Sequence, residues 1–376
     1  MAISDKSGKP ARQSRQGSET GAPGGSAAPA AGLAAGLEGG RRPTLKTIAE
    51  IAGLGVTTVS RALKDGPEIG EDTKRRVREI ARTVGYRPDR AGVRLRTGKT
   101  NVISLILNPH EEVLGYGSSM ILGMSKALRR TGYHLVVTPH FLEGDPMEPI
   151  RYIVETGAAD GIILSRTQPQ DQRIRYLLEL GFPFVSHGRT ELASAHPYHD
   201  FDNYEFAFEA ARRLTDLGRK RLSIVAPPDH VMFHTHMMMG LERAAHQFAA
   251  ALVPIPGIDL DSPPDIIRQV VYDMACGPDA PDGFICGGDV SAMALVAGLI
   301  DAGLRPGKDA DVVAKQTSPV LDQMRPVIDT FLEDLTKTGY ELASLLLRSI
   351  AGEPAEHLQT IGKPEPCFRT RAGVSD

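Results

Sequence analysis

The chain has 376 residues, with 43 Lys or Arg against 46 Asp or Glu, and therefore a formal net charge of −3. Its 41% apolar and 24% charged content excludes a mostly disordered chain, and the near balance of charges excludes a polycationic tail protein. The charge is unevenly distributed, because residues 41–100 carry 15 basic and 7 acidic side chains whereas residues 101–376 carry 24 and 36. A compact basic segment joined to an acidic body indicates that the first faces a polyanion and the second does not.

Length and cysteine content narrow the class further. A chain of this length has room for two or three domains. Its three cysteines, Cys276, Cys286 and Cys367, have no CxxC spacing, which argues against a disulfide framework or a structural zinc site and favours a reducing compartment. No uncharged apolar run approaches the ~20 residues of a membrane helix, and none resembles a signal-peptide core. We therefore expect a soluble intracellular protein with no membrane partner.

Residues 1–42 are rich in Gly, Ala, Ser and Pro and contain no aromatic side chain. Such a segment buries too little surface to offset the entropy lost on ordering. We expect residues 1–42 to form a disordered tail.

Three short amphipathic patterns follow the tail. Thr44 is an N-cap candidate, and apolar residues then recur at helical spacing from Leu45 to Ala52, where a glycine follows. A second apolar stripe covers Val56–Leu63, and a third covers Val77–Val84. Because a short turn containing glycine joins the first two helices, the pattern predicts a helix-turn-helix headpiece over residues 43–88.

The second of these helices has a polar face that suits DNA. Thr57, Ser60, Arg61 and Lys64 lie opposite the apolar stripe, so hydroxyls and two cations share one exposed side. An arginine can donate two hydrogen bonds to guanine, a threonine methyl can contact thymine, and a lysine can bind phosphate. Any one of these charges could be an ordinary solvated side chain, but the helix-turn-helix spacing together with the basic segment favours DNA binding. The third helix adds further cations, Lys74, Arg75, Arg76, Arg78 and Arg82.

After Gly98, strand-like apolar runs alternate with amphipathic helical stretches over about 270 residues. This alternation predicts an α/β fold of parallel sheets with helices on both faces, and the length favours two such lobes. The last helix is expected to be long, Val327–Ile350. The expected strands are Val102–Leu107, Leu135–Val137, Gly161–Leu164, Phe184–Ser186, Leu222–Val225, Phe284–Cys286 and Val312–Ala314.

The run from Arg42 to Lys99 resembles the headpiece and hinge of the lactose-repressor (LacI/GalR) family of bacterial transcription regulators. The resemblance lies in the first helix, in T-V-S-R of the second, in the T-x-x-x-V helix and in the G-Y-x-P turn. The acidic body resembles the family's periplasmic-binding-protein-like core, in the stretch from Asp202-Asn203 to Leu217–Arg221 and in Asp289 followed by a helix that ends in Ala-Gly-Leu. The resemblance covers roughly residues 42–370.

The resemblance implies which residues contact DNA. Residues 89–99 correspond to the family's hinge helix and linker, and Leu95 corresponds to a leucine that wedges into a central minor-groove step. Gly92 stands where the family usually has alanine, and a glycine inside a helix costs about 0.5–1 kcal/mol. Val56, Thr57 and Arg61 are placed at base edges, and the remaining DNA-contact candidates are Thr44, Leu45, Ser60, Lys64 and Thr73.

The resemblance also divides residues 100–370, the effector-binding and dimerisation core, into two lobes. Lobe 1 is expected at about residues 101–187 and 322–352, and lobe 2 at about residues 190–319 and 356–370. A small ligand, usually a sugar or a nucleobase, is expected between the lobes, beyond the carboxyl ends of the strands. Candidate effector-binding residues are His110, Glu111, Tyr116, Arg166, His187, Arg189, Phe233, His234, His236, Asp289 and Gln316.

Three departures from the family leave the ligand open. Met237 stands where many relatives have the arginine of R-x-x-G, Ala314-Lys315-Gln316 replaces a G-F-D carboxylate, and Gly288 precedes Asp289 where asparagine is frequent. His234 and His236 lack a third spaced ligand, so a hydrogen-bonding role is favoured over a metal site. We expect no metal and no cofactor.

The alternatives are an enzyme and an exported solute-binding protein. Catalytic motifs are missing: Gly98-Lys99-Thr100 ends like a phosphate loop, but Val93 occupies the required glycine position. An enzyme would need a carboxylate pair, which Glu111, Asp202 and Asp289 could supply, and an exported solute-binding protein would need a leader in place of the basic helices. The sequence favours a repressor that is not an enzyme, and that binds a near-palindromic operator as a homodimer and responds to a sugar-like effector.

Overall fold

The computed structural model describes residues 42–87, 98–108, 115–141 and 143–369. The expected tail, apart from Arg42, lies outside these residues, as do Leu95, His110, Glu111 and most of the expected hinge. The chain divides into two units, one up to Gly92 and the other from Val93 onward. The first is called the headpiece and the second the core.

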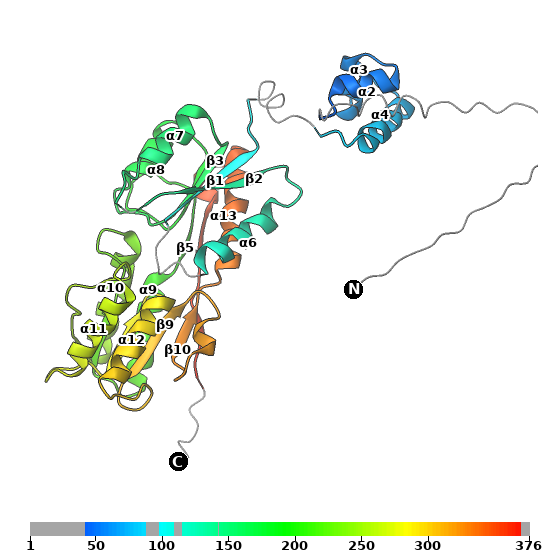
Figure 1. Ribbon diagram of the computed structural model, residues 1–376. Coiled ribbons are helices and arrows are strands. Elements are labelled where there is room, and N and C mark those ends of the chain that lie inside the picture. Colours follow the sequence, from blue (N-terminus) through cyan, green and yellow to red (C-terminus); the bar gives the residue numbers. More distant parts are fainter. Residues whose placement is uncertain (1–41, 88–97, 109–114, 142, 370–376) are drawn as a thin grey trace, which may run out of the picture. The chain divides into compact units, whose positions relative to one another are not determined.

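The headpiece consists of three helices, α2 (Leu45–Ala52), α3 (Val56–Leu63) and α4 (Glu71–Thr83) (Figure 1). Thr44 caps α2, because its side-chain oxygen accepts from the Thr47 amide while the Thr47 hydroxyl accepts from the Thr44 amide. Gly53 ends α2 with a φ of 63°, a conformation that favours glycine. The helices bury one small cluster, Ile48, Ala49, Val59, Ala62, Val77 and Ala81. The expected helix-turn-helix is confirmed.

The core contains two six-stranded sheets. Paired strands in both are parallel, except that β12 pairs antiparallel with β10. The first sheet has the order β11-β5-β4-β3-β1-β2, with β1 (Val102–Leu107), β2 (His134–Pro139), β3 (Gly161–Leu164), β4 (Phe184–His187), β5 (Tyr198–Phe201) and β11 (Gln359–Gly362). The second has the order β12-β10-β9-β8-β6-β7, with β6 (Arg221–Val225), β7 (Ala251–Leu252), β8 (Gly283–Cys286), β9 (Asp311–Gln316), β10 (Asp329–Leu332) and β12 (Glu365–Cys367).

Helices cover both faces of each sheet, as the alternating sequence predicts. Successive residues of β3 show this directly, because Ile162 and Ile163 belong to different buried clusters, one on each face of the first sheet. The helices of lobe 1 are α6 (Tyr116–Leu128), α7 (Glu148–Thr156), α8 (Gln172–Glu179) and α13 (Leu335–Ile350). Those of lobe 2 are α9 (Asn203–Asp216), α10 (Met232–Phe248), α11 (Pro264–Ala275) and α12 (Asp289–Asp301).

Helices α6 and α13 lie side by side and approach backbone to backbone (Figure 1). A Cβ on Gly123 would lie 2.0 Å from the Thr336 carbonyl oxygen, and one on Gly339 would lie 2.3 Å from the Met120 carbonyl oxygen. Glycine is required at both positions because any larger residue would push the helices apart.

The chain crosses between the sheets three times, and not where the sequence placed the crossings. Strands β5 and β11 pair in the first sheet, although residues 198–201 and 359–362 were assigned to lobe 2. Strand β10 pairs in the second sheet, although residues 329–332 were assigned to lobe 1 and to the start of a long helix. Asp334 caps α13, which begins only at Leu335. Alternation along the chain indicates that strands exist but not which sheet each one joins.

None of the helices in the described ranges is long and apolar enough to cross a bilayer.

Candidate DNA-binding surface and effector cavity

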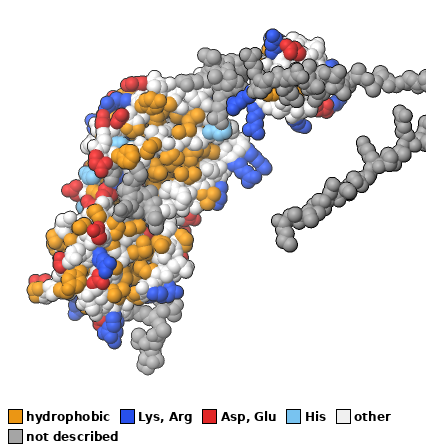
Figure 2. Space-filling view, in the orientation of Figure 1, with side chains coloured by type: hydrophobic (Ala, Val, Ile, Leu, Met, Phe, Trp, Pro, Cys, Tyr) orange, Lys and Arg blue, Asp and Glu red, His pale blue; other side chains and the backbone are white. Residues whose placement is uncertain are grey.

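Helix α3 exposes the face that the sequence predicts. Val59 and Ala62 are fully buried against α2 and α4, whereas Arg61 keeps 59% of its side chain exposed and Val56 is 45% exposed. Figure 2 shows Lys and Arg side chains at the headpiece surface. Of the other DNA-contact candidates, Thr44, Thr57 and Lys64 are exposed, and Leu45, Ser60 and Thr73 are partly buried.

The arginine of this face has one acidic neighbour within the headpiece. The Arg61 Nε atom lies 3.4 Å from Glu68 Oε1 in the loop that follows α3. Both side chains are about half exposed, and such pairs contribute little because water and salt screen them. Arg61 is therefore free to exchange Glu68 for an acceptor on a base.

One of the cations predicted for this surface has a structural position instead. Lys74 is 5% exposed, and its Nζ lies 2.8 Å from Glu71 and 3.2 Å from Asp65. Hydrogen bonds from Lys74 and Arg78 lower the pKa of Asp65. Lys74 thus connects α4 to the turn after α3, and its ammonium is engaged within the headpiece.

A cavity of about 130 Å³ lies in the core between the carboxyl ends of the two sheets. Lobe 1 contributes residues that follow β1, β3 and β4, and lobe 2 contributes residues from the start of α10 and from β9. Aromatic and apolar side chains form part of the wall, namely Leu107, Tyr116, Phe201, Met232, Phe233 and Leu260.

Six of the predicted effector residues line this cavity, Tyr116, Arg166, His187, Arg189, Phe233 and His236. Three others do not. The ring of His234 hydrogen bonds to the Pro227 carbonyl oxygen at 2.6 Å, and Asp289 is buried with its carboxylate bonded to Thr317. Gln316 is held by Ser318, Asp322 and Thr330.

Several polar lining residues were missed, among them Asp200, Asn203, Asp261, Lys315 and Glu333. Lys315 and Glu333 follow the rule of strand-end positions, because they lie at the ends of β9 and β10. In the sequence, Lys315 stands out only as a departure from the family pattern, and residues 329–332 lie within the stretch expected to be helical, Val327–Ile350. Asp200 lies in β5, a short strand without a clear apolar pattern.

The cations of the cavity are paired with carboxylates. Arg166 Nη1 and Nη2 lie 3.0 and 2.5 Å from the two oxygens of Asp261, a bidentate pair. Arg189 Nε lies 2.6 Å from Asp200 Oδ2. The third pair joins Lys315 to Glu333 at 3.0 Å. The charges of these groups compensate one another inside the cavity.

Three polar side chains that line the cavity, Tyr116, His187 and Glu333, contact one another in series. The Tyr116 hydroxyl lies 2.8 Å from His187 Nδ1, and His187 Nε2 lies 3.2 Å from Glu333 Oε1. Burial raises the pKa of Tyr116, which therefore stays protonated and can donate to His187. Burial also acts to raise the pKa of Glu333, but the Lys315 ammonium and the His187 ring outweigh it and lower the pKa to about 2. Glu333 is thus ionised at neutral pH.

Of the polar contacts that join the lobes across the cavity in the described residues, which include Arg189 Nη2 to the His236 ring at 3.5 Å, two are short. The Arg166–Asp261 pair connects the loop after β3 with the loop that precedes α11. The Met232 amide at the start of α10 donates to the Thr167 carbonyl oxygen at 2.7 Å. These contacts hold the lobes in the arrangement described, and separating the lobes would break both.

Comparison with known proteins agrees with this architecture. Residues 44–89 match the model for "Bacterial regulatory proteins, lacI family", and residues 211–371 match the model for a "Periplasmic binding protein-like domain". The chain is 29% identical to the HTH-type transcriptional regulator AglR of Rhizobium meliloti, over 88% of this chain and 94% of AglR. It is 27% identical to the regulator CelR of Thermobifida fusca, over 86% of this chain and 97% of CelR.

Solved structures share the fold. The Lac repressor bound to ONPG in the repressed state superposes with a TM-score of 0.74 at 18% identity, covering 88% of this chain and 99% of the repressor. A CelR–cellobiose complex gives a TM-score of 0.63 at 24% identity, and the match covers 87% of this chain and 99% of the chain in that structure. The relatives named here are transcriptional regulators and not enzymes. With a lacI-type helix-turn-helix followed by a periplasmic-binding-like core, the chain is a DNA-binding transcriptional regulator of the lacI family.

Proposed function

We propose that this regulator is a cytoplasmic repressor whose affinity for a near-palindromic operator is controlled by a small neutral sugar bound between the lobes of the core. The observation that carries the proposal is the cavity, where aromatic surfaces lie beside charge-compensated polar groups. Sugars need both, because their C–H faces pack on rings while their hydroxyls exchange hydrogen bonds.

The paired charges favour a neutral ligand. Arg166, Arg189 and Lys315 each have a carboxylate partner within 3.0 Å. A phosphate or carboxylate ligand would have to displace Asp261, Asp200 or Glu333 or lie close to them, and like charges repel strongly in a poorly hydrated site. The CelR–cellobiose complex supports a neutral sugar, since it shows that fold with such a ligand.

Coupling to DNA follows from the connections of the chain. The three crossings between sheets allow the lobes to change their mutual angle, and a ligand that contacts both lobes favours one angle. In a homodimer such a change would alter the separation of the segments that lead to the two headpieces. Operator affinity would then follow the population of the competent state.

The test is a two-step binding experiment on the full chain. Thermal shift is measured with mono- and disaccharides, sugar phosphates and purines, because a ligand at 100 times its Kd adds about 2.7 kcal/mol of stability. Fluorescence anisotropy with a ~14–20-bp inverted repeat from the DNA beside the gene then measures operator affinity with and without the hit. We expect a neutral sugar to raise the melting temperature and weaken operator binding. Binding of only purines or sugar phosphates, or a sugar without effect on operator affinity, contradicts the proposal.

A further inference from the structure

The chain enters the core through a short segment, Thr100 and Asn101, which is called the entry segment. It follows residues 88–97, which connect it in sequence to the headpiece, and it immediately precedes β1. Asn101 has a φ of 54°, in the left-handed region that residues other than glycine seldom adopt. A backbone conformation of this kind persists only where surrounding contacts hold it, so the entry segment depends on bonds to the rest of the core.

The Asp160 carboxylate supplies most of these bonds. Asp160 lies directly before β3, the strand that pairs with β1. Its Oδ1 accepts from the Thr100 amide at 2.7 Å and from the Thr100 hydroxyl at 2.8 Å, and its Oδ2 accepts from the Asn101 amide at 2.9 Å. The Asp160 amide donates in turn to the Val102 carbonyl oxygen at 2.8 Å. One side chain therefore binds both residues of the entry segment to the neighbouring strand.

The entry segment is also bound to β2. The Asn101 carbonyl oxygen accepts from the His134 amide at 2.9 Å, at the start of that strand. The side chain of Tyr133 lies near the same carboxylate, because burial and then the charge of Asp160 raise the pKa of its hydroxyl. The point where the chain enters the core is thus fixed to β1, β2 and β3, which are neighbours in the sheet of lobe 1.

We propose that Asp160 is a positioning residue for regulation, which clamps the entry segment to lobe 1 so that a change of the lobe angle moves the connection to the headpiece. A movement of the core alters the separation of two headpieces only if the joint at the entry segment transmits it. Without the Asp160 bonds the free connection would extend to Val102. A longer flexible connection absorbs displacement and lowers the effective concentration of the second headpiece at the operator. This inference rests on the proposed homodimer and on the proposed control of operator affinity by an effector.

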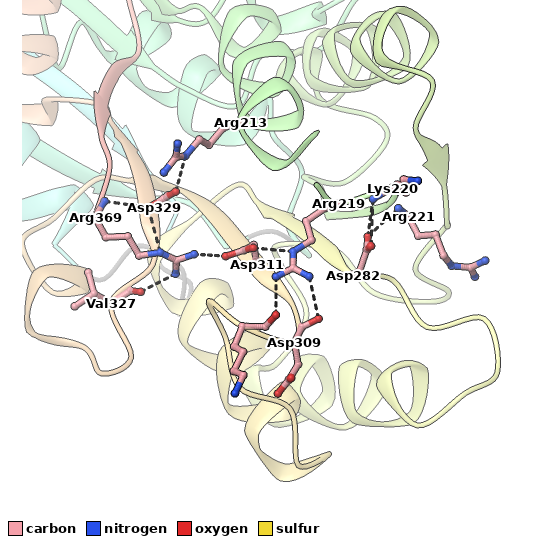
Figure 3. A network of polar contacts seen from close by, with 11 residues as sticks. Arg213, Arg219, Lys220, Arg221, Asp282, Asp309, Asp311, Val327, Asp329 and Arg369 are labelled. Carbon is pink, nitrogen blue, oxygen red and sulfur yellow. Dashed lines mark hydrogen bonds and ion pairs between the residues drawn. The ribbon is translucent and has the colours of Figure 1, made fainter. Parts of the chain in front are cut away.

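Lobe 2 contains a matching clamp that leads to no headpiece. Asp282 directly precedes β8, and its Oδ1 accepts from the Lys220 amide at 3.0 Å and from the Arg221 amide at 2.8 Å, at the start of β6 (Figure 3). Asp160 and Asp282 are both partly buried, and each precedes the glycine that begins its strand. The chain before Lys220 comes from α9 of the same lobe. Loss of Asp282 should therefore cost stability as loss of Asp160 does, without affecting the connection to the headpiece.

The experiment compares Asp160→Ala with Asp282→Ala in the full chain. Thermal unfolding measures the structural cost of each change, and fluorescence anisotropy measures affinity for the ~14–20-bp inverted repeat beside the gene. We expect similar losses of melting temperature in the two variants. Only Asp160→Ala should weaken ligand-free operator binding, by about threefold or more. Asp160→Asn and Asp282→Asn, which keep one acceptor oxygen, replace the alanine variants if these do not fold.

The response to an effector is the second readout. The probe is whichever of glucose, galactose, maltose, cellobiose, melibiose and trehalose binds the unmodified chain most tightly in calorimetry. All three proteins should bind the probe equally well without DNA, because neither Asp160 nor Asp282 is among the residues that line the cavity. The ratio of operator Kd with and without the probe, about 5- to 150-fold in typical allosteric coupling, should fall toward 1 in Asp160→Ala and stay unchanged in Asp282→Ala.

The matched pair makes the outcomes distinct. Equal effects of the two substitutions on operator affinity, or no effect of Asp160→Ala, would show that Asp160 is only structural and overturn the proposal. An effector response in Asp160→Ala equal to that of the unmodified protein also overturns it. If none of the sugars binds the unmodified chain, the proposed effector class fails, and the ligand-free comparison of operator affinity still decides the role of Asp160.

Discussion

Arg61 is the α3 side chain with the most hydrogen-bonding capacity toward bases. Its neighbours on the exposed face, Val56 and Thr57, offer methyl groups and one hydroxyl. Its contact with Glu68 is weak and exposed. Discrimination between operators should therefore depend mainly on this residue.

We predict that Arg61→Ala weakens binding to the operator by about 10- to 100-fold, the usual effect of removing a bidentate contact to a base. Binding to scrambled duplex should fall much less, because one lost cation weakens all sequences alike. Fluorescence anisotropy at fixed salt measures both. Arg212→Ala, at an exposed position in lobe 2, is the control. Unchanged discrimination between operator and scrambled duplex would contradict the assignment of Arg61.

The buried His199 makes stability depend on pH. Burial, followed by the charge of His187, lowers the pKa of His199 from 6.5 to about 4, and its Nδ1 lies 2.8 Å from the Thr360 hydroxyl, joining β5 to β11. The unfolded chain binds a proton below pH 6.5 whereas the folded chain does not until about pH 4. Stability from this group is therefore complete above pH 6.5 and is lost as the pH falls toward 4.

We predict that His199→Gln flattens the fall of the unfolding free energy between pH 6.5 and 4 by up to about 3 kcal/mol, the energy that corresponds to this shift. Urea denaturation at a series of pH values measures the slope. The exposed His134→Gln provides the comparison. A slope for His199→Gln equal to that of the unmodified protein would rule out this contribution.

At the scale of elements, the C-terminal strand is fastened by a buried charge network (Figure 3). Asp311 and Asp329 are fully buried, and Arg369, just after β12, contacts both. Arg219 and Arg213 contact Asp311 and Asp329 respectively, each at 2.7 Å. Phe368 adds an edge-to-face contact with Phe331 of β10. The network holds an antiparallel strand of only three residues at the sheet edge.

We predict that Arg369→Met destabilises the core by about 3 kcal/mol, because it leaves two buried carboxylates undercompensated. Thermal unfolding of the full chain should show a midpoint several degrees lower. Arg305→Met breaks an exposed pair with Asp309 and should leave the midpoint unchanged. Equal midpoints for Arg369→Met and Arg305→Met would show that the network does not stabilise the strand.

At the scale of the whole molecule, the Arg166–Asp261 pair is the strongest side-chain connection described across the cavity. Both side chains are mostly buried, and the pair is bidentate. It lies beside the Met232 amide, which also bonds across the lobes. The pair therefore favours the lobe arrangement seen in the structure.

We predict that Arg166→Gln increases hydrogen exchange of the segment 229–236, because more frequent separation of the lobes exposes the Met232 amide. Exchange followed by mass spectrometry measures this in the ligand-free chain. Arg151→Gln, at an exposed pair in the same lobe, is the matched control. Identical exchange in both variants would mean that the pair does not control the lobe arrangement.

Local patterns predicted the headpiece because its helices are amphipathic and its turn contains glycine. The exposed face of α3 follows from 3.6-residue periodicity alone, and so do the buried Val59 and the partly buried Leu63 that packs against the same cluster. In the core, alternation predicted parallel sheets, and the strand-end rule found six lining residues of the cavity.

Errors arose where the outcome depends on contacts distant in sequence. His234 and His236 lie two residues apart on α10, so they face different sides of the helix, and only the true start at Met232 decides which one faces the cavity. Asp200 and Glu333 were missed because β5 and β10 have no clear strand pattern of their own. They are recognisable as strands only through their pairing with β4 and β9.

The sequence by itself determined the two-part organisation, the recognition face of α3 and the α/β class of the core, because each follows from periodicity, charge or motif within a few residues. Only the tertiary structure decided which sheet each crossing strand joins and which cations pair with which carboxylates. These features depend on tertiary contacts, some between residues more than 100 positions apart, such as Lys315 and Asn203, whose proximity no local pattern contains.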